Sequence, residues 1–191
     1  DFENNGKLQI VEAKFEDGKC LPRRGLGCTS DAMPTIKEKL PTYHDFAISE
    51  LVEIYSQNGL EDADKFEVNN LDSGVLINQG GEGVPTFEFR KLPRVVQASP
   101  VFGSTLTDVN ADGFLDLYVV QNFHGPQRET GNFNGGVSLL LLGDGSGDFA
   151  PVWPDQSGLV VGKDGGALTV TDLDGDARPD FVVSVNNRQP K

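Results

Sequence analysis

The sequence predicts an all-β protein that is built from repeated strands and turns. Its 191 residues include 23 glycines and 11 prolines but one methionine and one tryptophan, a composition that is typical of turn-rich β proteins. Aspartate-rich loops are followed at once by β-branched apolar runs, and two other stretches indicate β-hairpins. Because these features recur in the same order along the chain, they favour a repeat architecture.

The first clear loop is DVNADGFLD at residues 108–116, where oxygen-bearing side chains stand at alternate positions. Its start is similar to an EF-hand loop, which ends in a bidentate Glu at position 12. Val119 occupies that position here, inside an apolar run (LYVVQN) that predicts a strand over residues 117–122. The expected oxygen donors lie at positions 1, 3, 5 and 9 of the loop: Asp108, Asn110, Asp112 and Asp116.

A second copy of the loop, DLDGDARPD, occupies residues 172–180 and precedes the predicted strand FVVSVNN. Both copies carry Asp at position 9, which identifies this position as the closing donor. The glycine of the second copy stands at position 4, with Ala177 at position 6, so its turn is expected to differ from that of the first. Its donors at positions 1, 3, 5 and 9 are Asp172, Asp174, Asp176 and Asp180.

A weaker copy, DFENNGKLQ, opens the sequence and precedes a predicted strand over Ile10–Ala13. Gln9 replaces the closing Asp, so this loop offers two carboxylates and two amides. Any cation would therefore be held more weakly than in the other two loops. Its donors at positions 1, 3, 5 and 9 are Asp1, Glu3, Asn5 and Gln9.

Between the loops, residues 73–89 and 137–152 each predict a hairpin: an apolar strand, a Gly-rich turn and a second strand that contains Phe. Asp108 and Asp172, which open the two clear loops, are 64 residues apart. The resulting repeats cover about 1–95, about 96–160 and an incomplete third from about 161. The first repeat is longer because it contains an insertion over about 17–66.

The insertion predicts one helix over residues 41–59, PTYHDFAISELVEIYSQNG. Thr42 and Asp45 would cap its start and Gly59 would end it. Its apolar face is expected to contain five residues: Phe46, Ala47, Leu51, Ile54 and Tyr55. The two cysteines of the insertion, Cys20 and Cys28, are expected to form a disulfide in an oxidising compartment, with free thiols as the alternative.

The formal charge of −13 argues against a nucleic-acid or anionic-membrane partner, because few basic residues could neutralise phosphates. Part of this acidity is concentrated in the loops. The longest strongly apolar run, Val137–Leu142, is far shorter than a membrane-spanning helix, so none is expected. The sequence opens at Asp1 without a basic or apolar leader, and any signal peptide is expected to lie outside it.

Taken with these loops and hairpins, the chain resembles the FG-GAP or VCBS repeat family of integrin α-chain propellers and many bacterial surface proteins. The family pairs a Phe-Gly or Gly-Gly element with a D-x-[DN]-x-[DN]-G-x-x-D loop. Here Phe102-Gly103-Ser104 precedes the loop at 108, and Gly165-Gly166-Ala167 precedes the loop at 172. The resemblance implies a β-propeller in which each repeat supplies about one four-stranded blade.

The resemblance also implies that each loop binds Ca²⁺ through its side-chain donors and a main-chain carbonyl at position 7. That position is held by Phe114, Arg178 and, in the weaker copy, Lys7. Carboxylate, amide and carbonyl oxygens suit calcium, whereas magnesium takes fewer protein ligands; an Asp/Asn turn without metal is the alternative. The chain holds about three blades while propellers close with about 4 to 8. We therefore expect a segment of a longer propeller, with the remaining blades from the same parent or from other chains.

These observations predict a non-catalytic, calcium-stabilised scaffold at an extracellular, cell-surface or periplasmic location. A protein or carbohydrate ligand would bind at residues 122–134 and 20–58. The alternative is the propeller part of a secreted polysaccharide-degrading enzyme, which rests on fold analogy. His44 and His124 lie in no metal or nucleophile motif. A dockerin-like module is excluded because the loops lead into strands and not into helices.

Overall fold

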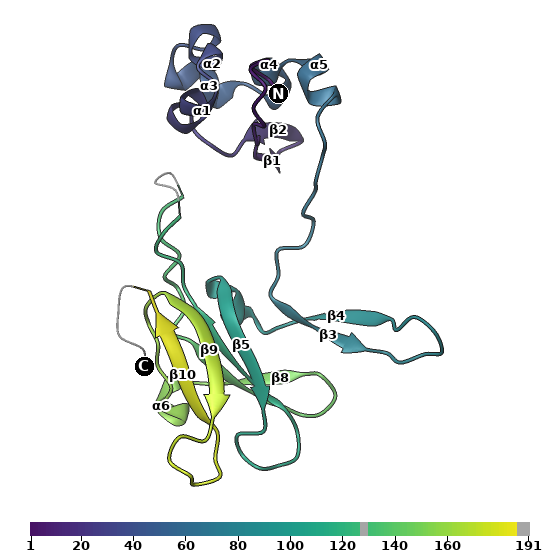
Figure 1. Cartoon of the computed structure of the whole chain (residues 1–191), viewed down its shortest axis with the longest axis vertical. Coiled ribbons are helices and arrows are strands. Elements are labelled where there is room, and N and C mark those ends of the chain that lie inside the picture. Colours follow the sequence, from purple (N-terminus) through teal and green to yellow (C-terminus); the bar gives the residue numbers. More distant parts are fainter. Residues whose placement is uncertain (127–129, 187–191) are drawn as a thin grey trace. The chain divides into compact units, whose positions relative to one another are not determined.

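A computed structural model describes residues 1–126 and 130–186 of the chain. The chain divides into two compact units, Asp1–Val68 (unit 1) and Asn69–Lys191 (unit 2) (Figure 1). Unit 1 contains the weaker aspartate loop and most of the helical residues, whereas unit 2 contains both clear loops and most of the strands. The two units are described separately below.

Unit 1 combines one antiparallel hairpin, β1 (Ala13–Glu16) with β2 (Lys19–Pro22), and five short helices. The helices are α1 (Leu26–Ala32), α2 (Thr35–Lys39), α3 (Tyr43–Ile48), α4 (Leu51–Tyr55) and α5 (Gln57–Glu61). Their buried side chains form one apolar core: Leu26, Met33, Ile36, Phe46, Leu51, Ile54 and Tyr55. Helices this short are marginal alone in water, so this core supplies most of their stability.

The single helix predicted over residues 41–59 is wrong, because the segment forms α3, α4 and α5 with breaks between them. Its start is confirmed, since the Asp45 amide donates to the Thr42 hydroxyl at 3.1 Å. Glu50 then begins a new helix through a capping box with Glu53, which satisfies the amides that a continuous helix would have bonded internally. Ser56 adopts φ of 67°, which interrupts the chain again.

Two further predictions fail at these breaks. Gly59 was expected to end the helix and instead lies inside α5. Ala47 was expected on the apolar face and is exposed, while the other four residues of that face are buried.

The strand predicted over Ile10–Ala13 is also wrong, because only Ala13 belongs to a strand. Val11 packs against the helical core and not into a sheet, and Ile10 is exposed. The disulfide between Cys20 and Cys28 is not confirmed, since the structure contains no bond between them. Cys20 lies on β2, where it packs against the apolar core, and Cys28 lies in α1.

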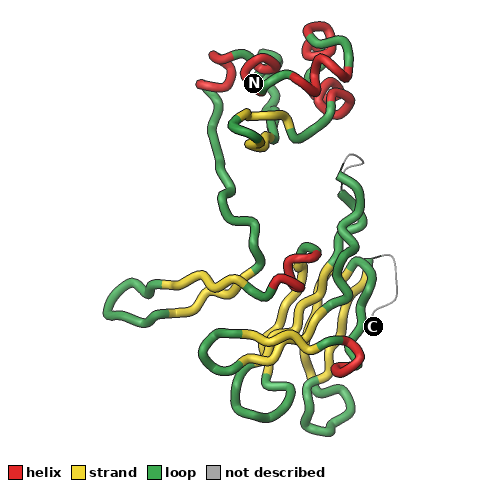
Figure 2. The backbone as a smooth tube through the Cα atoms, turned by 180° about the vertical axis from the view of Figure 1, so that it is seen from behind, coloured by secondary structure: helices red, strands yellow, loops and turns green. Residues whose placement is uncertain are grey.

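Unit 2 is organised around a four-stranded antiparallel sheet in the order β5-β6-β7-β8 (Figure 2). Its strands follow one another along the chain: β5 (Val101–Thr107), β6 (Asp116–Gln121), β7 (Leu139–Gly143) and β8 (Phe149–Val152). β9 (Gly165–Thr171) and β10 (Asp180–Val185) form a separate antiparallel pair, which packs beside β5. The predicted strands after both clear loops are therefore confirmed as β6 and β10.

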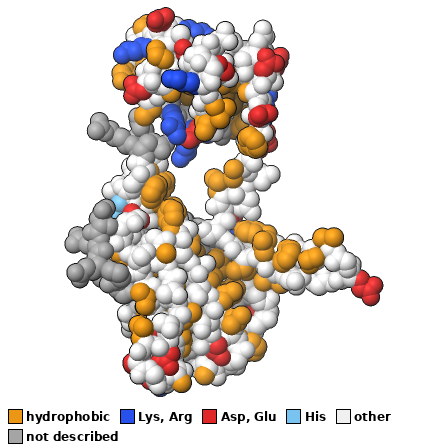
Figure 3. All heavy atoms as spheres, in the orientation of Figure 1, with side chains coloured by type: hydrophobic (Ala, Val, Ile, Leu, Met, Phe, Trp, Pro, Cys, Tyr) orange, Lys and Arg blue, Asp and Glu red, His pale blue; other side chains and the backbone are white. Residues whose placement is uncertain are grey.

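Both predicted hairpins are confirmed. β3 (Gly74–Asn78) pairs with β4 (Phe87–Lys91), and β7 pairs with β8. Short helical turns follow each of them, η1 (Arg94–Ala98) and α6 (Pro154–Ser157). The β3–β4 hairpin extends from the sheet and carries several apolar side chains on its surface (Figure 3).

Strand β6 is buried along its whole length because it has an apolar layer on each face. Leu117 and Val119 pack with β7 and η1 on one face: the cluster is Leu92, Val96, Leu117, Val119, Leu139 and Leu141. Tyr118 and Val120 face the β9–β10 pair on the other: this cluster is Tyr118, Val120, Leu140, Val161, Val183 and Val185. Successive strand residues point to opposite faces, which explains this division.

The described part of the chain is thus mostly β, arranged in small antiparallel sheets, with the helices gathered in unit 1. Among the described residues, no helix has the length and apolar character needed to cross a membrane.

Candidate cation-binding loops

The two clear loops connect paired strands, at the same end of unit 2 (Figure 2). Residues 108–116 join β5 to β6, and residues 172–180 join β9 to β10. In each loop the position-9 aspartate is also the first residue of the following strand, Asp116 in β6 and Asp180 in β10. The strands therefore fix the two ends of each loop relative to one another.

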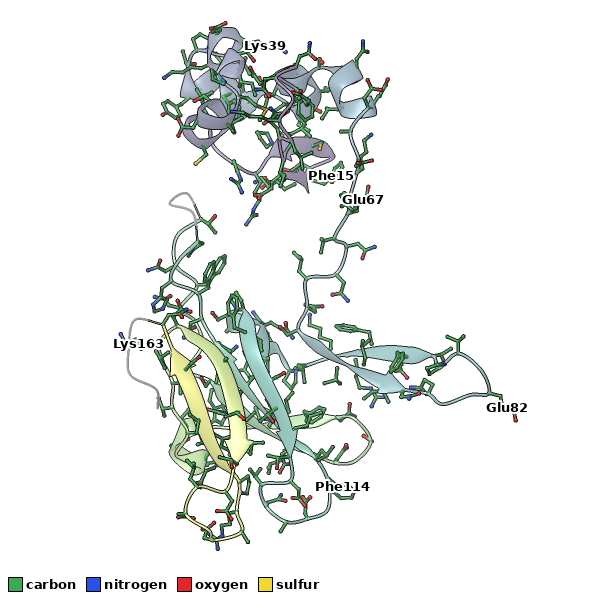
Figure 4. All side chains as sticks on the ribbon, viewed as in Figure 1. Phe15, Lys39, Glu67, Glu82, Phe114 and Lys163 are labelled. Carbon is green, nitrogen blue, oxygen red and sulfur yellow. The ribbon has the colours of Figure 1, made fainter. Side chains whose placement is uncertain are left out.

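In the first of these loops, side-chain oxygens accept hydrogen bonds from the amides of the turn. Asp108 accepts from the Gly113 amide at 2.9 Å and from the Asp112 amide at 3.2 Å. Asn110 also accepts from the Asp112 amide, at 3.0 Å, and Asp112 accepts from the Phe114 amide at 2.8 Å. The loop thus curls around the donors at positions 1, 3 and 5, and Phe114 extends from its end (Figure 4).

The second loop makes the same arrangement with different residues. Asp172 accepts from the Ala177 amide at 3.0 Å, Asp174 from the Asp176 amide at 3.1 Å, and Asp176 from the Arg178 amide at 2.8 Å. The shared bonds run from position 6 to position 1, from position 5 to position 3 and from position 7 to position 5.

The closing aspartates at position 9 accept hydrogen bonds from the amide at position 2 of each loop. Asp116 accepts from the Val109 amide at 2.9 Å through one oxygen and from the Gly143 amide at 2.9 Å through the other. Asp180 accepts from the Leu173 amide at 2.8 Å. Only 1% of Asp116 is exposed, so its carboxylate holds the loop to the sheet whether or not it also contacts an ion.

The weaker loop in unit 1 repeats three of these bonds. Asp1 accepts from the Gly6 amide, and Asn5 accepts from the Lys7 amide at 3.0 Å. Gln9 accepts from the Phe2 amide at 2.9 Å, as the position-9 aspartates accept from position 2. The amide of Gln9 therefore preserves the loop shape while it removes one negative charge.

Glu3, the remaining donor of the weaker loop, accepts a hydrogen bond from the Thr35 hydroxyl of α2. This contact occupies a position-3 side chain that, in the two clear loops, bonds only within the loop. The weaker loop thus keeps its backbone shape with a different set of charges.

The expected difference in turn geometry between the loops is wrong, because positions 4 and 6 have positive φ in every copy. The values are 52° at Asn4, 76° at Gly6, 61° at Ala111, 89° at Gly113, 80° at Gly175 and 65° at Ala177. Glycine adopts this region without steric cost, and alanine does so with strain. The loops thus exchange which of the two positions carries glycine, while the backbone path stays the same.

The second loop concentrates negative charge. One carboxylate oxygen from each of Asp172, Asp174 and Asp176 lies within 4.8 Å of the others, and all three residues are exposed. The Arg178 guanidinium lies 4.0 Å from Asp176 and is itself largely exposed, so it neutralises little of this charge. Like charges at this separation repel by about 1 kcal/mol per pair in water.

This donor set fits a hard divalent cation. Carboxylate oxygens on alternate residues, with an amide oxygen in the first loop, are the ligands that calcium prefers. The predicted carbonyl donors Phe114 and Arg178 lie at the ends of the turns, where their amides are bonded to position 5. The two clear loops lie in unit 2 and the weaker one in unit 1.

The structure also contains a buried polar cluster that the sequence did not predict. Asn122 is fully buried and has φ of 85°. Its side-chain NH₂ donates to the carbonyls of Gly136 at 2.9 Å and Lys163 at 3.2 Å. Its side-chain oxygen accepts from the Gly136 amide at 2.9 Å. The one sequence signal for this conformation is the asparagine itself, because Asn tolerates positive φ better than most residues. The cluster joins the β6–β7 connection to the β8–β9 connection and has a structural role.

The predicted ligand-binding segments are spread over both units. Residues 20–58 form β2 and the helices of unit 1, and residues 122–134 form a connection between β6 and β7, of which 127–129 lie outside the described residues. The amide of His124 donates to the buried Asp164 at 3.3 Å, and His44 lies in α3. The two histidines thus lie in different units.

Comparison with protein-family models matches residues 108–183 to the FG-GAP-like repeat. The match begins at the first donor of one clear loop and ends in β10, just after the other. It therefore contains β6, β7, β8 and β9, most of β10, and both loops, whereas β5 lies just before it. Comparisons with curated proteins and with solved structures gave no match.

Proposed function

From the FG-GAP-like repeat that residues 108–183 carry, we propose that unit 2 is part of a β-propeller whose aspartate loops bind calcium. The antiparallel sheet β5-β6-β7-β8 has the strand number and order of one propeller blade. By the repeat pattern, β9–β10 supplies the first half of the next blade and β3–β4 the second half of the preceding one. These three pieces support the propeller assignment.

The calcium assignment rests on one observation: both clear loops curl their oxygen donors together through the same hydrogen bonds, and in one of them three carboxylates lie within 4.8 Å. The residues that would hold the ion are Asp108, Asn110, Asp112, Phe114 and Asp116 in one loop, and Asp172, Asp174, Asp176, Arg178 and Asp180 in the other. The weaker site would use Asp1, Glu3, Asn5, Lys7 and Gln9.

A bound ion would replace carboxylate repulsion with attraction and crosslink each loop to the strand that follows it. This role would be structural, because the side chains that would bind the ion also accept the hydrogen bonds that shape the turn. Sites of this kind, built from a short exposed segment, match the weaker calcium affinities of extracellular modules, about 10⁻⁴ to 10⁻³ M. We therefore place the protein in an extracellular, cell-surface or periplasmic setting, where calcium reaches such concentrations.

In that setting the protein would act as a non-catalytic scaffold for adhesion or ligand binding. A protein or carbohydrate would bind at the connection over residues 122–134, at the segment 20–58, or at both, since binding residues are commonly presented on loops that a rigid scaffold supports. Affinity electrophoresis against neutral and acidic polysaccharides, with calcium and with EGTA, tests the carbohydrate case.

The calcium proposal is tested by thermal unfolding of the full chain with EGTA and with millimolar calcium. The wild-type chain is expected to melt several degrees higher in calcium. The double variant Asp112→Ala/Asp176→Ala is expected to lose most of this shift.

Glu82→Gln provides the control, because Glu82 is an exposed carboxylate at the tip of the β3–β4 hairpin, outside both loops (Figure 4). It removes a negative charge without touching a proposed donor, so its calcium shift should equal that of the wild type. An unchanged shift in the double variant would show that calcium acts elsewhere.

A further inference from the structure

The weaker loop of unit 1 differs from the two clear loops in the chemical group that its position-9 side chain directs at the other donors. The oxygen of Gln9 accepts from the Phe2 amide at 2.9 Å, as the position-9 aspartates of the clear loops accept from their position-2 amides. Because a side-chain amide carries one oxygen and one NH₂, this bond fixes the orientation of Gln9. Its NH₂ group therefore stands where an aspartate would place a second oxygen.

This NH₂ group donates to the Asn5 side-chain oxygen at 3.3 Å. The same oxygen also accepts from the Lys7 amide at 3.0 Å. An amide oxygen has two lone pairs, and two protein donors thus use both of them at Asn5. A cation that coordinated Asn5 would have to displace one of these hydrogen bonds.

Position 5 is different in the clear loops, where it is a carboxylate. Asp112 and Asp176 each accept from the position-7 amide at 2.8 Å through one oxygen. The other oxygen of Asp112 accepts from the Asn110 NH₂ at 2.9 Å. A carboxylate has about four lone-pair sites, so both side chains can bind a cation and keep their bonds within the loop.

The two carboxylates of the weaker loop are also engaged. One oxygen of Asp1 accepts from the Asn5 amide at 3.1 Å and the other from the Gly6 amide. Glu3 accepts from the Thr35 hydroxyl of α2. Calcium affinity depends on the number of charged ligands, and this loop has two where the clear loops have three and four. Its donor set therefore does not fit calcium as well as theirs do.

Contacts that involve no ion attach the weaker loop to the helices of unit 1. Phe2, at position 2, packs against the apolar core beside α4 (Figure 1), with its ring centroid 5.2 Å from that of Tyr55. A Cβ added to Gly59 of α5 would lie 3.1 Å from the Phe2 ring. The bond from Thr35 to Glu3 adds a contact to α2. The loop is thus held at three helices.

We propose that Gln9 makes the weaker loop independent of calcium. Its NH₂ supplies to Asn5 a contact that an ion would supply in a loop with Asp at position 9, and the packing of Phe2 holds the loop to the core. The fold of unit 1 then does not depend on the calcium concentration. This inference rests on the calcium binding proposed above and restricts it to the two clear loops.

Gln9→Asp is expected to create a calcium site. The variant loop would have three carboxylates and one amide, as the loop over residues 108–116 has. The test is made in the full chain with Asp108→Ala and Asp174→Ala, which remove the stronger binding of the clear loops. Equilibrium dialysis against calcium at about 1 mM should detect no ion bound in this background, and about one ion per chain once Gln9→Asp is added.

Two further variants control for charge and for folding. Asn4→Asp adds the same charge to the same loop at a position that is not a donor; Asn4 is exposed, and aspartate tolerates its φ of 52°. This variant should gain no ion. Gln9→Glu replaces the NH₂ by an oxygen without shortening the side chain and keeps the acceptor for Phe2. It provides the test if Gln9→Asp does not fold.

Thermal unfolding gives a second measurement that does not require calcium to bind. The far-UV helical signal follows unit 1, where most helical residues lie, and Trp153 fluorescence follows unit 2. In EGTA, Gln9→Asp should lower the melting temperature of unit 1 by a few degrees, because a carboxylate cannot donate to Asn5 and repels the other carboxylates. Calcium should restore it. The wild-type unit 1 should melt at the same temperature in EGTA and in calcium.

Three results would overturn the proposal: Gln9→Asp and Gln9→Glu that bind no more calcium than their background, an equal gain in Asn4→Asp, or a calcium-dependent melting temperature of the wild-type unit 1. In each case, wild-type chains that bind two ions leave the proposed function standing. Wild-type chains that bind no calcium would instead contradict the proposed function. The comparison in EGTA then decides the role of Gln9, which equal stability of Gln9→Asp and wild type would exclude.

Discussion

The Asp116 carboxylate accepts a hydrogen bond from the Gly143 amide at 2.9 Å, so the last residue of an exposed loop holds the end of strand β7. Its other oxygen accepts from the Val109 amide at the start of the same loop. Asp116 therefore joins the loop, β6 and β7 without an ion. This separates the role of position 9 from that of the exposed donors at positions 1, 3 and 5.

Asp116→Asn is expected to destabilise unit 2 even in EGTA. The substituted amide has one acceptor oxygen in place of two, so one half-buried backbone amide, of Val109 or of Gly143, loses its partner and faces an NH₂ group. The expected loss is about 1 to 3 kcal/mol in the free energy of unfolding, measured by urea denaturation. Asp112→Asn is the control, because Asp112 is exposed and should change stability by less than about 0.5 kcal/mol in EGTA. Equal losses in the two variants would contradict a separate role for position 9.

Ala177→Gly is expected to stabilise the second loop. Ala177 holds φ of 65°, which a glycine adopts without the clash of a Cβ with its backbone. The expected gain is about 1 kcal/mol in the free energy of unfolding, reduced by the greater freedom of glycine in the unfolded chain. Ala167→Gly in β9 is the matched control and should destabilise, because glycine weakens a strand. A loss of stability in Ala177→Gly would argue against the shared loop geometry.

Asn122→Ala is expected to cost about 3 kcal/mol in the free energy of unfolding, since it leaves the buried polar groups of Gly136 without a partner. Differential scanning calorimetry measures the change. Asn70 caps an exposed turn by accepting from the Asp72 amide, so Asn70→Ala should have a small effect. A loss in Asn122→Ala no larger than in Asn70→Ala would mean that water replaces these bonds.

Alkaline pH is expected to destabilise unit 2 through Tyr118. Burial raises the pKa of the Tyr118 phenol, and its ring packs on Phe181 with centroids 4.7 Å apart. The neutral phenol contributes its full stabilisation below the unfolded pKa of 10.0, and this is lost as the pH rises through the unfolded and then the folded pKa. Trp153, the single tryptophan, reports unfolding of unit 2.

Urea denaturation at about pH 8 and about pH 10.5 measures this dependence. Tyr118→Phe should lose less stability between the two pH values than the wild type does. The same loss in both proteins would assign the alkaline sensitivity to other groups.

The sequence predicted the parts of the fold that depend on local chemistry. Alternating oxygen donors followed by β-branched residues located β6 and β10, and glycine-rich turns between apolar runs located both hairpins. These signals lie within a few residues of the elements that they specify.

The remaining features depended on competition between local alternatives or on distant contacts. Glu50 and Glu53 form a capping box that begins a new helix, an outcome that apolar periodicity cannot distinguish from a continuous helix. In the second clear loop, Asp172 accepts from the Ala177 amide, and Ala177 adopts the positive φ that glycine has at position 6 of the other two loops. The position of glycine in the sequence therefore predicted a difference in turn geometry that the structure does not have. The burial of Asn122 and Asp116 follows from connections that are far away in the sequence.

The central claim is that the two clear loops bind calcium, and the number of ions bound per chain tests it most directly. Equilibrium dialysis of the full chain against calcium should give about two ions in the stronger phase. Asp174→Ala, which removes one of the three clustered carboxylates, should leave one, and Asp108→Ala combined with Asp174→Ala should leave none in that phase. Glu82→Gln should match the wild type. Wild-type chains that bind no calcium at millimolar concentrations, or loop variants that bind as many ions as the wild type, would contradict the account.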